Sequence, residues 1–375
     1  MSHISKEERE IPKTMSTQHP DNARAPNWSN REIIDGDLEI YEAYFAYNAL
    51  GCQEAMWDSE GKDADTRVVR KLLSNFGDYF KAHMIGKDVF LTYRIPNPRI
   101  ETVERKIVVE TLQNIPVAHD IASAFYEREV TPIFEVILPF TTDSSELIGL
   151  RNYYEKVIVA AENVELTESL RVKDWIGSFK PKSIQVIPLV EDFNSISAID
   201  KILEPYIDIV KPRYLRVFIA RSDPALNYGL FSAVLLAKLA LSKLKKLETE
   251  REVPMYPILG VGSMPFRGHL SPENCEGFLH EYEGLSTVTV QSALKYDCQP
   301  ERVKQVVSIL NERLPNGEPT QIEPYEEETL HKILKKASSE YERVVEEFAP
   351  LVNSIASYVP NRRARKLHIG LFGYS

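Results

Sequence analysis

The sequence has few cysteines, no long apolar run and no excess of positive charge. Its three cysteines, Cys52, Cys275 and Cys298, lie far apart and form no CxxC pair. This pattern predicts free thiols in a reducing cytosol and argues against a disulfide scaffold. No stretch approaches the roughly 20 apolar residues of a membrane-spanning helix, and the charged N-terminus lacks the apolar core of a signal peptide. We therefore expect a soluble, cytoplasmic protein.

The charge balance is acidic, with 45 basic and 55 acidic residues and a formal net charge of −10. Such a balance argues against a general surface for nucleic acid or for an acidic membrane. The chain is 43% hydrophobic and 27% charged, which is ordinary for a folded domain and argues against disorder. Its 375 residues are enough for one large buried core.

Eight short runs, most of them rich in β-branched residues, recur along the chain, and nearly all end on a polar residue or a glycine. They cover residues 54–60, 89–94, 133–139, 184–192, 215–223, 256–263, 287–293 and 367–375. Stretches long enough for a helix separate them, which predicts an α/β fold, a closed (β/α)₈ barrel of the TIM type. In this fold the chemistry lies at the C-terminal ends of the strands, and about 250 residues suffice for the barrel alone, so we expect extra helices.

The chain is expected to divide into two parts at about residue 30. Residues 1–30 are polar, and we expect a loop segment that carries His19 and folds over the barrel mouth. Residues 31–375 then form the barrel, with a helical insertion at about 299–360 between the seventh and eighth strands. Because the sequence stops at the end of the eighth run, we expect that the last barrel helix is missing and that the sequence is truncated at its C-terminus.

Two carboxylates close neighbouring strands of the expected barrel. Glu191 follows the fourth strand and Asp223 follows the fifth. Since neighbouring strands lie about 4.8 Å apart, the two carboxylates can share one cation. With no histidine or cysteine nearby, these oxygen donors suit Mg²⁺ or Mn²⁺. The alternative is a local role, because Asp223 before Pro224 is also a good helix N-cap.

Basic residues also gather at strand ends despite the acidic total. Arg94 ends the second strand, Arg221 the fifth, and Lys295 follows the seventh. Inward basic residues in an acidic protein predict a small anionic substrate. After the sixth strand, the glycine-bearing segment 260–269 offers backbone N–H groups for an oxyanion, and Arg267 adds a bidentate donor. A simple tight turn remains an alternative for this segment.

Further polar residues are candidates for the same pocket. Gly262 and Ser263 would supply the backbone contacts of the loop, and Gln291 closes the seventh strand. Gln291 either lines the pocket or hydrogen-bonds to the layer beneath it. His19 acts as an acid–base group if its segment covers the barrel mouth, and otherwise lies on the surface.

Seven segments, taken together and in order, resemble the archaeal-type phosphoenolpyruvate carboxylase family. They are MSTQHPDNA, MWDSEGKD, FLTYRIPNP, PLVEDFNSI, ARSDPALNYG, GVGSMPFRG and TVQSALKYD. The resemblance runs from residue 14 to the end of the sequence. It implies carboxylation of phosphoenolpyruvate by bicarbonate to oxaloacetate and phosphate, with Mg²⁺ or Mn²⁺, in a homotetramer that replenishes the tricarboxylic acid cycle.

The resemblance also implies roles for individual residues. Glu191 and Asp223 match the metal carboxylates of the family, and His19 matches its essential histidine, which acts as a base. Arg267 matches the loop arginine that guides bicarbonate onto the phosphoryl group, and Arg94 matches a phosphate-binding arginine. Glu191, Asp223, His19 and Arg267 are therefore expected to face one another across the barrel mouth.

This sequence also departs from larger relatives. They carry two arginines in the glycine-bearing loop, where only Arg267 is present here, and a lysine at the position of Leu226. Arg221 or Lys295 would have to replace the missing charges. Two other readings stay open: a different phosphoenolpyruvate or pyruvate lyase with the same metal pair, and a non-catalytic remnant.

Overall fold

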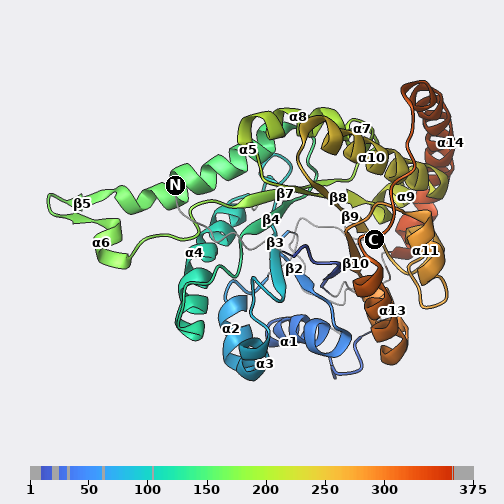
Figure 1. Ribbon diagram of the computed structural model, residues 1–375. Coiled ribbons are helices and arrows are strands. Elements are labelled where there is room, and N and C mark those ends of the chain that lie inside the picture. The colour runs from blue at the N-terminus through green and yellow to red at the C-terminus, as the bar shows by residue number, and fades with distance from the viewer. Residues whose placement is uncertain are drawn as a thin grey trace.

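The computed structural model of the protein describes residues 10–18, 25–31, 34–60, 64–103, 105–356 and 358. Within these residues, parallel strands form a closed barrel in the order β1-β10-β9-β8-β7-β4-β3-β2, and helices surround it (Figure 1). The barrel strands are β1 (Thr14–Ser16), β2 (Glu54–Asp58), β3 (Phe90–Arg94), β4 (Glu135–Leu138), β7 (Gln185–Val190), β8 (Leu215–Ala220), β9 (Met255–Gly260) and β10 (Thr287–Val290). The predicted (β/α)₈ barrel is therefore confirmed.

The helices follow the strands in the order that a barrel of this type requires. They are α1 (Asp37–Phe45), α2 (Val68–Asn75), α3 (Gly77–Ala82), α4 (Ile107–Tyr126), α5 (Ser144–Tyr153), α6 (Val172–Ile176), α7 (Phe193–Ser197), α8 (Ile199–Val210), α9 (Ser222–Tyr228), α10 (Leu230–Arg251), α11 (Cys275–Glu281), α12 (Ser292–Asp297), α13 (Pro300–Arg313) and α14 (Pro324–Ala356). Shorter helical turns are η1 (Ala46–Leu50), η2 (Tyr154–Val159), η3 (Ala160–Asn163) and η4 (Pro265–Arg267). Within the described residues, no helix has both the length and the apolar character needed to cross a bilayer.

Among the described residues, the strand that closes the barrel is β1, near the start of the chain. β1 pairs in parallel with β10 on one side and with β2 on the other, which closes the barrel. The expectation that residues 1–30 form only a loop was therefore wrong. Residues 367–375 lie outside the described residues, but their expected place between β10 and β2 is already filled. A strand of three residues, TMS, is too short to show an alternating pattern, so the sequence did not reveal it.

Because β1 closes the barrel, the helices after β10 have other roles than the sequence predicted. α13 follows β10 and packs against β1 and η1, so it takes the place of the eighth barrel helix. The expected absence of this helix does not hold for the described part of the chain. Residues 299–360 also do not separate two barrel strands there, because α13 belongs to the barrel and α14 lies further out, on α9 and α10.

Alternate side chains of the strands point into the barrel and form layers. The middle layer is apolar and is made by Met15, Met56, Ile137, Ile187, Leu189, Phe218, Ala220 and Ile258. The intervening residues, such as Ala55 and Trp57 of β2, belong to a second apolar cluster that the barrel shares with its helices. The barrel interior is thus packed and is no channel, so a ligand has access only to its ends.

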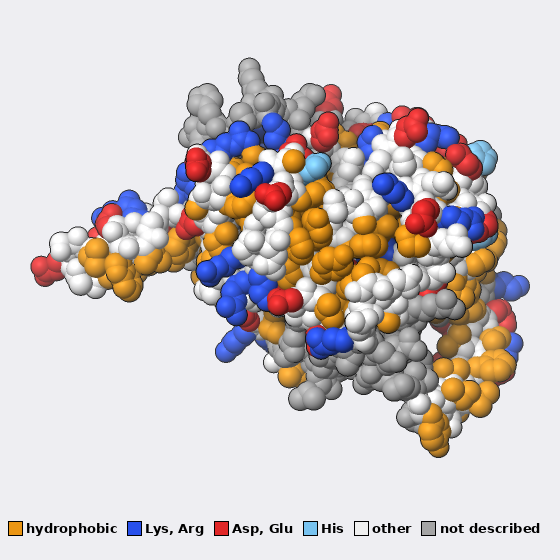
Figure 2. Space-filling model, turned by 90° about the horizontal axis from the view of Figure 1, so that it is seen from below, with side chains coloured by type: hydrophobic (Ala, Val, Ile, Leu, Met, Phe, Trp, Pro, Cys, Tyr) orange, Lys and Arg blue, Asp and Glu red, His pale blue; other side chains and the backbone are white. Residues whose placement is uncertain are grey.

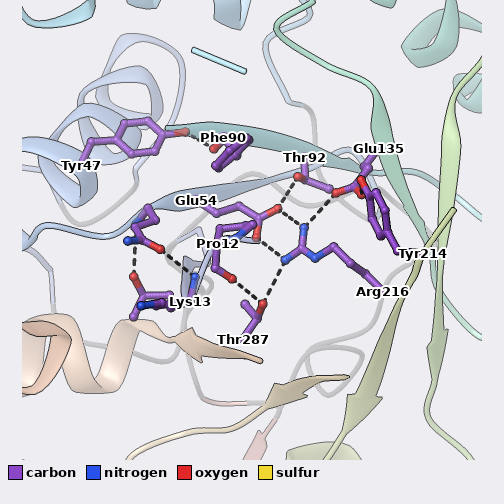
Figure 3. Close-up of polar contacts among 12 residues, drawn as sticks. Pro12, Lys13, Tyr47, Glu54, Phe90, Thr92, Glu135, Tyr214, Arg216 and Thr287 are labelled. Atoms are coloured by element: carbon purple, nitrogen blue, oxygen red, sulfur yellow. Dashed lines mark hydrogen bonds and ion pairs between the residues drawn. The ribbon is translucent and has the colours of Figure 1, made fainter. Parts of the chain in front are cut away.

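The layer at the N-terminal end of the barrel is ionic (Figure 3). The Arg216 guanidinium pairs with Glu54 at 2.7 Å and with Glu135 at 2.9 Å, and all three side chains are almost fully buried. Thr92 donates to Glu54 and Thr287 accepts from Arg216, whereas Arg216 Nε has no hydrogen-bond partner among the described residues. Burial lowers the pKa of Arg216, but the charges of the two glutamates outweigh it, so the net shift is upward. This network, which was not predicted from the sequence, ties β2, β4, β8 and β10 together.

Two parts of the chain project from this body. Between α5 and β7, the chain forms an arm made of η3, the hairpin β5 (Glu165–Thr167) and β6 (Leu170–Arg171), and α6 (Figure 1). α6 has no buried residue. α14 extends beyond its contacts with α9 and α10, and hydrophobic side chains gather on both projections (Figure 2).

Candidate active site

The inward rows of side chains continue past the apolar layer and become polar at the C-terminal ends of the strands. In β2, Glu54 lies in the ionic layer and Met56 in the apolar layer, so Asp58 reaches the mouth. The same alternation brings Arg94 of β3, opposite Asp58 in the strand register, to this end. Glu191 follows Ile187 and Leu189 in the inward row of β7. The mouth is therefore lined by charged residues from neighbouring strands.

Glu191 and Asp223, the two predicted metal ligands, lie close enough to affect each other. Burial raises the pKa of Glu191 well above its usual value, and the charges of Asp223 and Glu60 raise it further. Burial also raises the pKa of Asp223, although the charges of Arg267 and Arg94 oppose the shift. The structure therefore brings the two carboxylates together in one mouth, together with both arginines.

This group of carboxylates fits a divalent cation. Asp223 and Glu60 both oppose a negative charge on the buried Glu191, and a bound cation would offset that repulsion. Among the described residues, no three histidine, cysteine or acidic side chains form a complete metal-binding cluster. Mg²⁺ does not require one, because it commonly binds one or two carboxylates and takes its other ligands from water and substrate.

A main-chain N–H fixes one oxygen of Glu191. The Phe140 amide donates to Glu191 Oε2 at 2.8 Å, and Phe140 has a positive φ of 50°. A non-glycine residue in this region is strained, and such strain often accompanies functional sites. Asn97 and Thr141 hold the turn in place through hydrogen bonds to Pro139 and Leu138. Nothing in the residue types of this turn requires a positive φ, so it could not be predicted from the sequence.

Arg94 is held by two carboxylates. Its Nε and Nη2 atoms donate to the two oxygens of Asp58 at 3.0 and 2.8 Å, and Nη2 also lies 3.0 Å from Glu60. Asp58 and Glu60 close the first predicted strand, where the sequence left open whether they line the pocket or bond to the layer beneath; the structure places both against Arg94. A phosphate contact by Arg94 would therefore have to share its guanidinium with Asp58.

Arg267 lies in the mouth, on the loop after β9. Its main-chain oxygen accepts hydrogen bonds from Gly262 N at 2.8 Å and Ser222 Oγ at 3.1 Å, which fix the loop. Its charge acts on Asp223. Its Nε atom is buried and has no hydrogen-bond partner in the described structure. The predicted loop arginine thus presents an unused donor beside the carboxylates.

Arg221, a predicted substrate-binding residue, instead supports this loop from behind. Its side chain is buried, donating from Nε to Tyr282 Oη at 2.8 Å and from Nη1 to the Phe266 carbonyl at 3.0 Å. Residues 216, 218 and 220 of β8 point inward, so the next residue points outward. The position of Arg221 at a strand end predicted an inward side chain, but the alternation along β8 turns it outward.

Gly262 and Gln291 lie beside Arg267, and Gln291 Nε2 also donates to Thr289 Oγ1 in the layer beneath at 3.4 Å. A Cβ atom at Gly262 would lie 3.1 Å from Arg267 Cβ and 3.3 Å from Gln291 Oε1, which is tight contact. Glycine therefore lets Gln291 and Arg267 approach each other. Ser263 is half-buried on the loop. The contact between an anion and these three residues stays a prediction.

Lys295, another predicted substrate-binding residue, is buried in α12. Its Nζ atom donates to Glu42 Oε1 at 2.9 Å and to Ser16 Oγ at 3.1 Å, and it also contacts the Thr17 carbonyl. These contacts turn the ammonium toward the protein interior. In this structure Lys295 anchors the C-terminal end of β1.

His19 lies outside the described residues, but the residues before it do not. The Thr17 amide donates to the Val290 carbonyl at 3.2 Å and extends the β1–β10 pairing. The Asp58 amide donates to Gln18 Oε1 at 2.6 Å. The chain therefore reaches position 18 at the barrel mouth, beside the carboxylates.

Comparison with known proteins gives the chain clear relatives. A family model described as phosphoenolpyruvate carboxylase matches residues 11–375. The phosphoenolpyruvate carboxylase of Metallosphaera sedula is 52% identical over 367 residues, which are 98% of this chain and 72% of that protein. The enzyme of the same name from Methanothermobacter thermautotrophicus is 46% identical over 97% of this chain and 75% of its own length.

Solved structures resemble the chain only weakly. A citrate lyase from Burkholderia xenovorans has a TM-score of 0.43 at 11% identity, over 90% of this chain and 94% of its own. RipC from Yersinia pestis has a TM-score of 0.38 at 14% identity, over 70% of this chain and 89% of its own. These likenesses are too weak to support an argument, and the fold assignment rests on the strand order itself.

Proposed function

The chain belongs to the phosphoenolpyruvate carboxylase family of enzymes, and from this premise we propose that its barrel mouth carboxylates phosphoenolpyruvate with bicarbonate in a Mg²⁺- or Mn²⁺-dependent reaction. The products are oxaloacetate and phosphate. The observation that carries the proposal is the meeting of Glu191, Asp223 and Arg267 at one end of the barrel. A reaction between two anions needs both a cation and a fixed hydrogen-bond donor. In this mouth, Glu191 and Asp223 would bind the cation, and Arg267 is the donor.

Glu191 and Asp223 would hold the metal ion. When bound, this ion supplies positive charge that stabilises the developing enolate of phosphoenolpyruvate. The Phe140 amide keeps one oxygen of Glu191 occupied at 2.8 Å, which fixes the direction of the other oxygen. The two carboxylates therefore need little rearrangement when the ion binds.

Arg267 would orient bicarbonate toward the phosphoryl group. An oxygen of bicarbonate attacks phosphorus, the bond between phosphorus and the enol oxygen breaks, and carboxyphosphate and the enolate form. Loss of a single fixed donor to the transferring group commonly costs about 10²–10³ in rate. The support by Arg221 and Ser222 keeps Arg267 in position without rearrangement during the reaction.

His19 would act as the base in the second half of the reaction. It removes the proton from carboxyphosphate, which then splits into phosphate and CO₂, and the enolate carbon captures the CO₂. His19 follows Gln18 directly, and Gln18 accepts a hydrogen bond from Asp58 at the mouth. Arg94 stays the candidate contact for the phosphate of phosphoenolpyruvate.

A coupled assay tests the proposed reaction. Malate dehydrogenase and NADH report oxaloacetate, with phosphoenolpyruvate, bicarbonate and Mg²⁺ supplied. We expect NADH oxidation that requires all three and that falls at least about 10³-fold in Asp223→Asn, because the variant loses a metal carboxylate. Formation of pyruvate or of another product without bicarbonate would favour a different lyase.

The cellular setting is part of the proposal. We expect a cytoplasmic homotetramer that replenishes the tricarboxylic acid cycle with oxaloacetate. The absence of a membrane-spanning helix among the described residues is compatible with this setting. Analytical ultracentrifugation at micromolar protein concentration measures the oligomeric state directly, and a monomer would contradict this part.

A further inference from the structure

Gln18 is fixed at the barrel mouth by contacts from two strand ends. The Asp58 amide donates to its side-chain oxygen at 2.6 Å, and Ser292 Oγ donates to its main-chain carbonyl at 3.3 Å. Thr17, just before it, is still paired with Val290 of β10. Both the main chain and the side chain of Gln18 are therefore held in place, at a position that the sequence analysis did not single out.

The contact with Asp58 determines which way the amide of Gln18 faces. A main-chain N–H can only donate, so the atom that it meets must be the oxygen of Gln18. The NH₂ group then faces away from Asp58. Its Nε2 atom is buried and, within the described structure, has no hydrogen-bond partner. A buried donor without a partner calls for an explanation, such as a ligand that this donor binds.

A second buried donor without a partner lies on the same side of the mouth. It is Nε of Arg267 on the loop after β9. β9, β10 and β1 are consecutive in the barrel, and the start of α12 contacts both sides, since Ser292 bonds to Gln18 and Gln291 lies beside Gly262 and Arg267. Gln291 turns its Oε1 toward Gly262 and donates from Nε2 to Thr289 Oγ1, so within the described residues Gln18 and Arg267 offer the unpartnered donors on this side of the mouth.

We propose that Gln18 is a substrate-binding residue, whose Nε2 donates a hydrogen bond to an oxygen of the bicarbonate that Arg267 holds. This inference rests on the proposed function and adds a residue to it. This pair of donors combines one cation with one neutral amide, which matches a singly charged oxyanion with several oxygens. The phosphate of phosphoenolpyruvate carries more charge and suits the part of the mouth that has Arg94 and the metal carboxylates.

Gln18→Glu is the variant that isolates the donor. Glutamate keeps an oxygen for the Asp58 amide but has no N–H to offer, and its charge repels an anion. We expect the KM for bicarbonate to rise at least tenfold, while the KM for phosphoenolpyruvate changes less than twofold. Gln18→Met also removes the N–H donor but adds no charge, and it should raise the KM for bicarbonate about fivefold. This second variant serves as the test if Gln18→Glu does not fold.

Gln53→Glu is the matched control. Gln53 Oε1 also accepts a hydrogen bond from a main-chain amide, that of Lys13, at 2.8 Å, but at the opposite end of the barrel. The same substitution there should leave both KM values unchanged. An equal rise in the two KM values of a folded Gln18 variant, or no rise for bicarbonate in either variant, would overturn the role of Gln18.

A binding measurement separates this inference from the proposed function. The NMR line width of ¹³C-labelled bicarbonate with Mg²⁺ and enzyme reports binding without turnover. We expect broadening with the wild type and Gln53→Glu, and little with Gln18→Glu. If Gln18→Glu broadens the signal as much as the wild type, the inference is overturned. If only Gln18→Glu loses the broadening but the wild type forms no oxaloacetate, the role of Gln18 stands and only the proposed reaction is wrong.

Discussion

Glu191 shows how much of this site depends on the environment of a single side chain. Burial, followed by the charges of Asp223 and Glu60, raises its pKa above the usual value of 4.5. Without a metal ion, the folded protein therefore keeps a proton on Glu191 at pH values where the unfolded chain has lost it. The folded state binds more protons in that window, so the free energy of unfolding falls as the pH rises through it.

This linkage gives a prediction for Glu191→Gln. The variant cannot titrate, so it should lose less stability than the wild type between pH 5 and pH 8 in EDTA, measured by urea unfolding. Each unit by which the pKa is raised corresponds to about 1.4 kcal/mol. Added Mg²⁺ should restore the wild type at pH 8 but stabilise the variant much less. Parallel stability curves in EDTA would show that Glu191 does not titrate in this window.

Arg267→Gln tests the donor on the loop after β9. We expect kcat to fall about 10²–10³-fold, the usual cost of a lost donor to the reacting group. The thermal midpoint should change little, because the loop is held by main-chain contacts of residue 267 and by Arg221. Initial rates at saturating substrate, beside a thermal melt, provide both values, and a kcat within twofold of wild type would exclude the assigned role.

For single residues, the sequence predicted the site best where the position along a strand decides whether a side chain points into the barrel mouth. Glu191 and Asp223 follow adjacent strands, and the structure places them together as expected. Arg221 and Lys295 follow strands too, but Arg221 falls on the outward side of its strand and Lys295 on a helix that turns it toward Glu42. A residue at a strand end reaches the mouth only if it lies on the inward row.

At the level of strands and helices, the buried ionic network around Arg216 stabilises the packing of the barrel strands. This side chain joins Glu54 of β2 to Glu135 of β4 with no solvent contact. We expect Arg216→Met to lower the free energy of unfolding by about 3–5 kcal/mol, because it leaves two buried carboxylates without a partner. Urea unfolding measures the loss.

Arg251→Met is the control for this prediction. Arg251 pairs with Asp208 on the surface, where such an ion pair contributes about 0–1 kcal/mol. In addition, a triple variant with Glu54→Gln, Glu135→Gln and Arg216→Met should recover much of the lost stability. If Arg216→Met costs no more than Arg251→Met, the network does not support the barrel.

The sequence predicted seven of the barrel strands because each shows a short run of apolar residues, and most of these runs are rich in β-branched residues. It missed β1 for the opposite reason, since Thr14–Ser16 are all buried but only three residues long. Pairing with β10 and β2 stabilises this strand, and such partners are not visible in the local pattern. The assignment of the last helices then failed as a consequence, because the barrel was thought to close at residues 367–375.

For the molecule as a whole, exposed apolar surface gathers on the projecting arm (Figure 2). Trp175 of α6 is 70% exposed, and a groove of about 400 Å³ at the base of the arm is lined by Val117, Val157 and Phe179 among others. A two-stranded hairpin is at best marginally stable without further packing. We therefore expect the arm to be covered in the proposed homotetramer.

Trp175→Glu should shift the homotetramer toward smaller species in analytical ultracentrifugation, because it places a charge in an apolar contact. Val103→Glu is a suitable control, since Val103 is 69% exposed but lies outside the arm. Equal sedimentation of Trp175→Glu and wild type would remove the arm from the subunit contact.

The central claim is that bicarbonate attacks phosphorus at the mouth formed by Glu191, Asp223 and Arg267. Mass spectrometry of the phosphate released from phosphoenolpyruvate and ¹⁸O-labelled bicarbonate tests this step directly. We expect each phosphate to carry one heavy oxygen from bicarbonate. Phosphate without the label would contradict it.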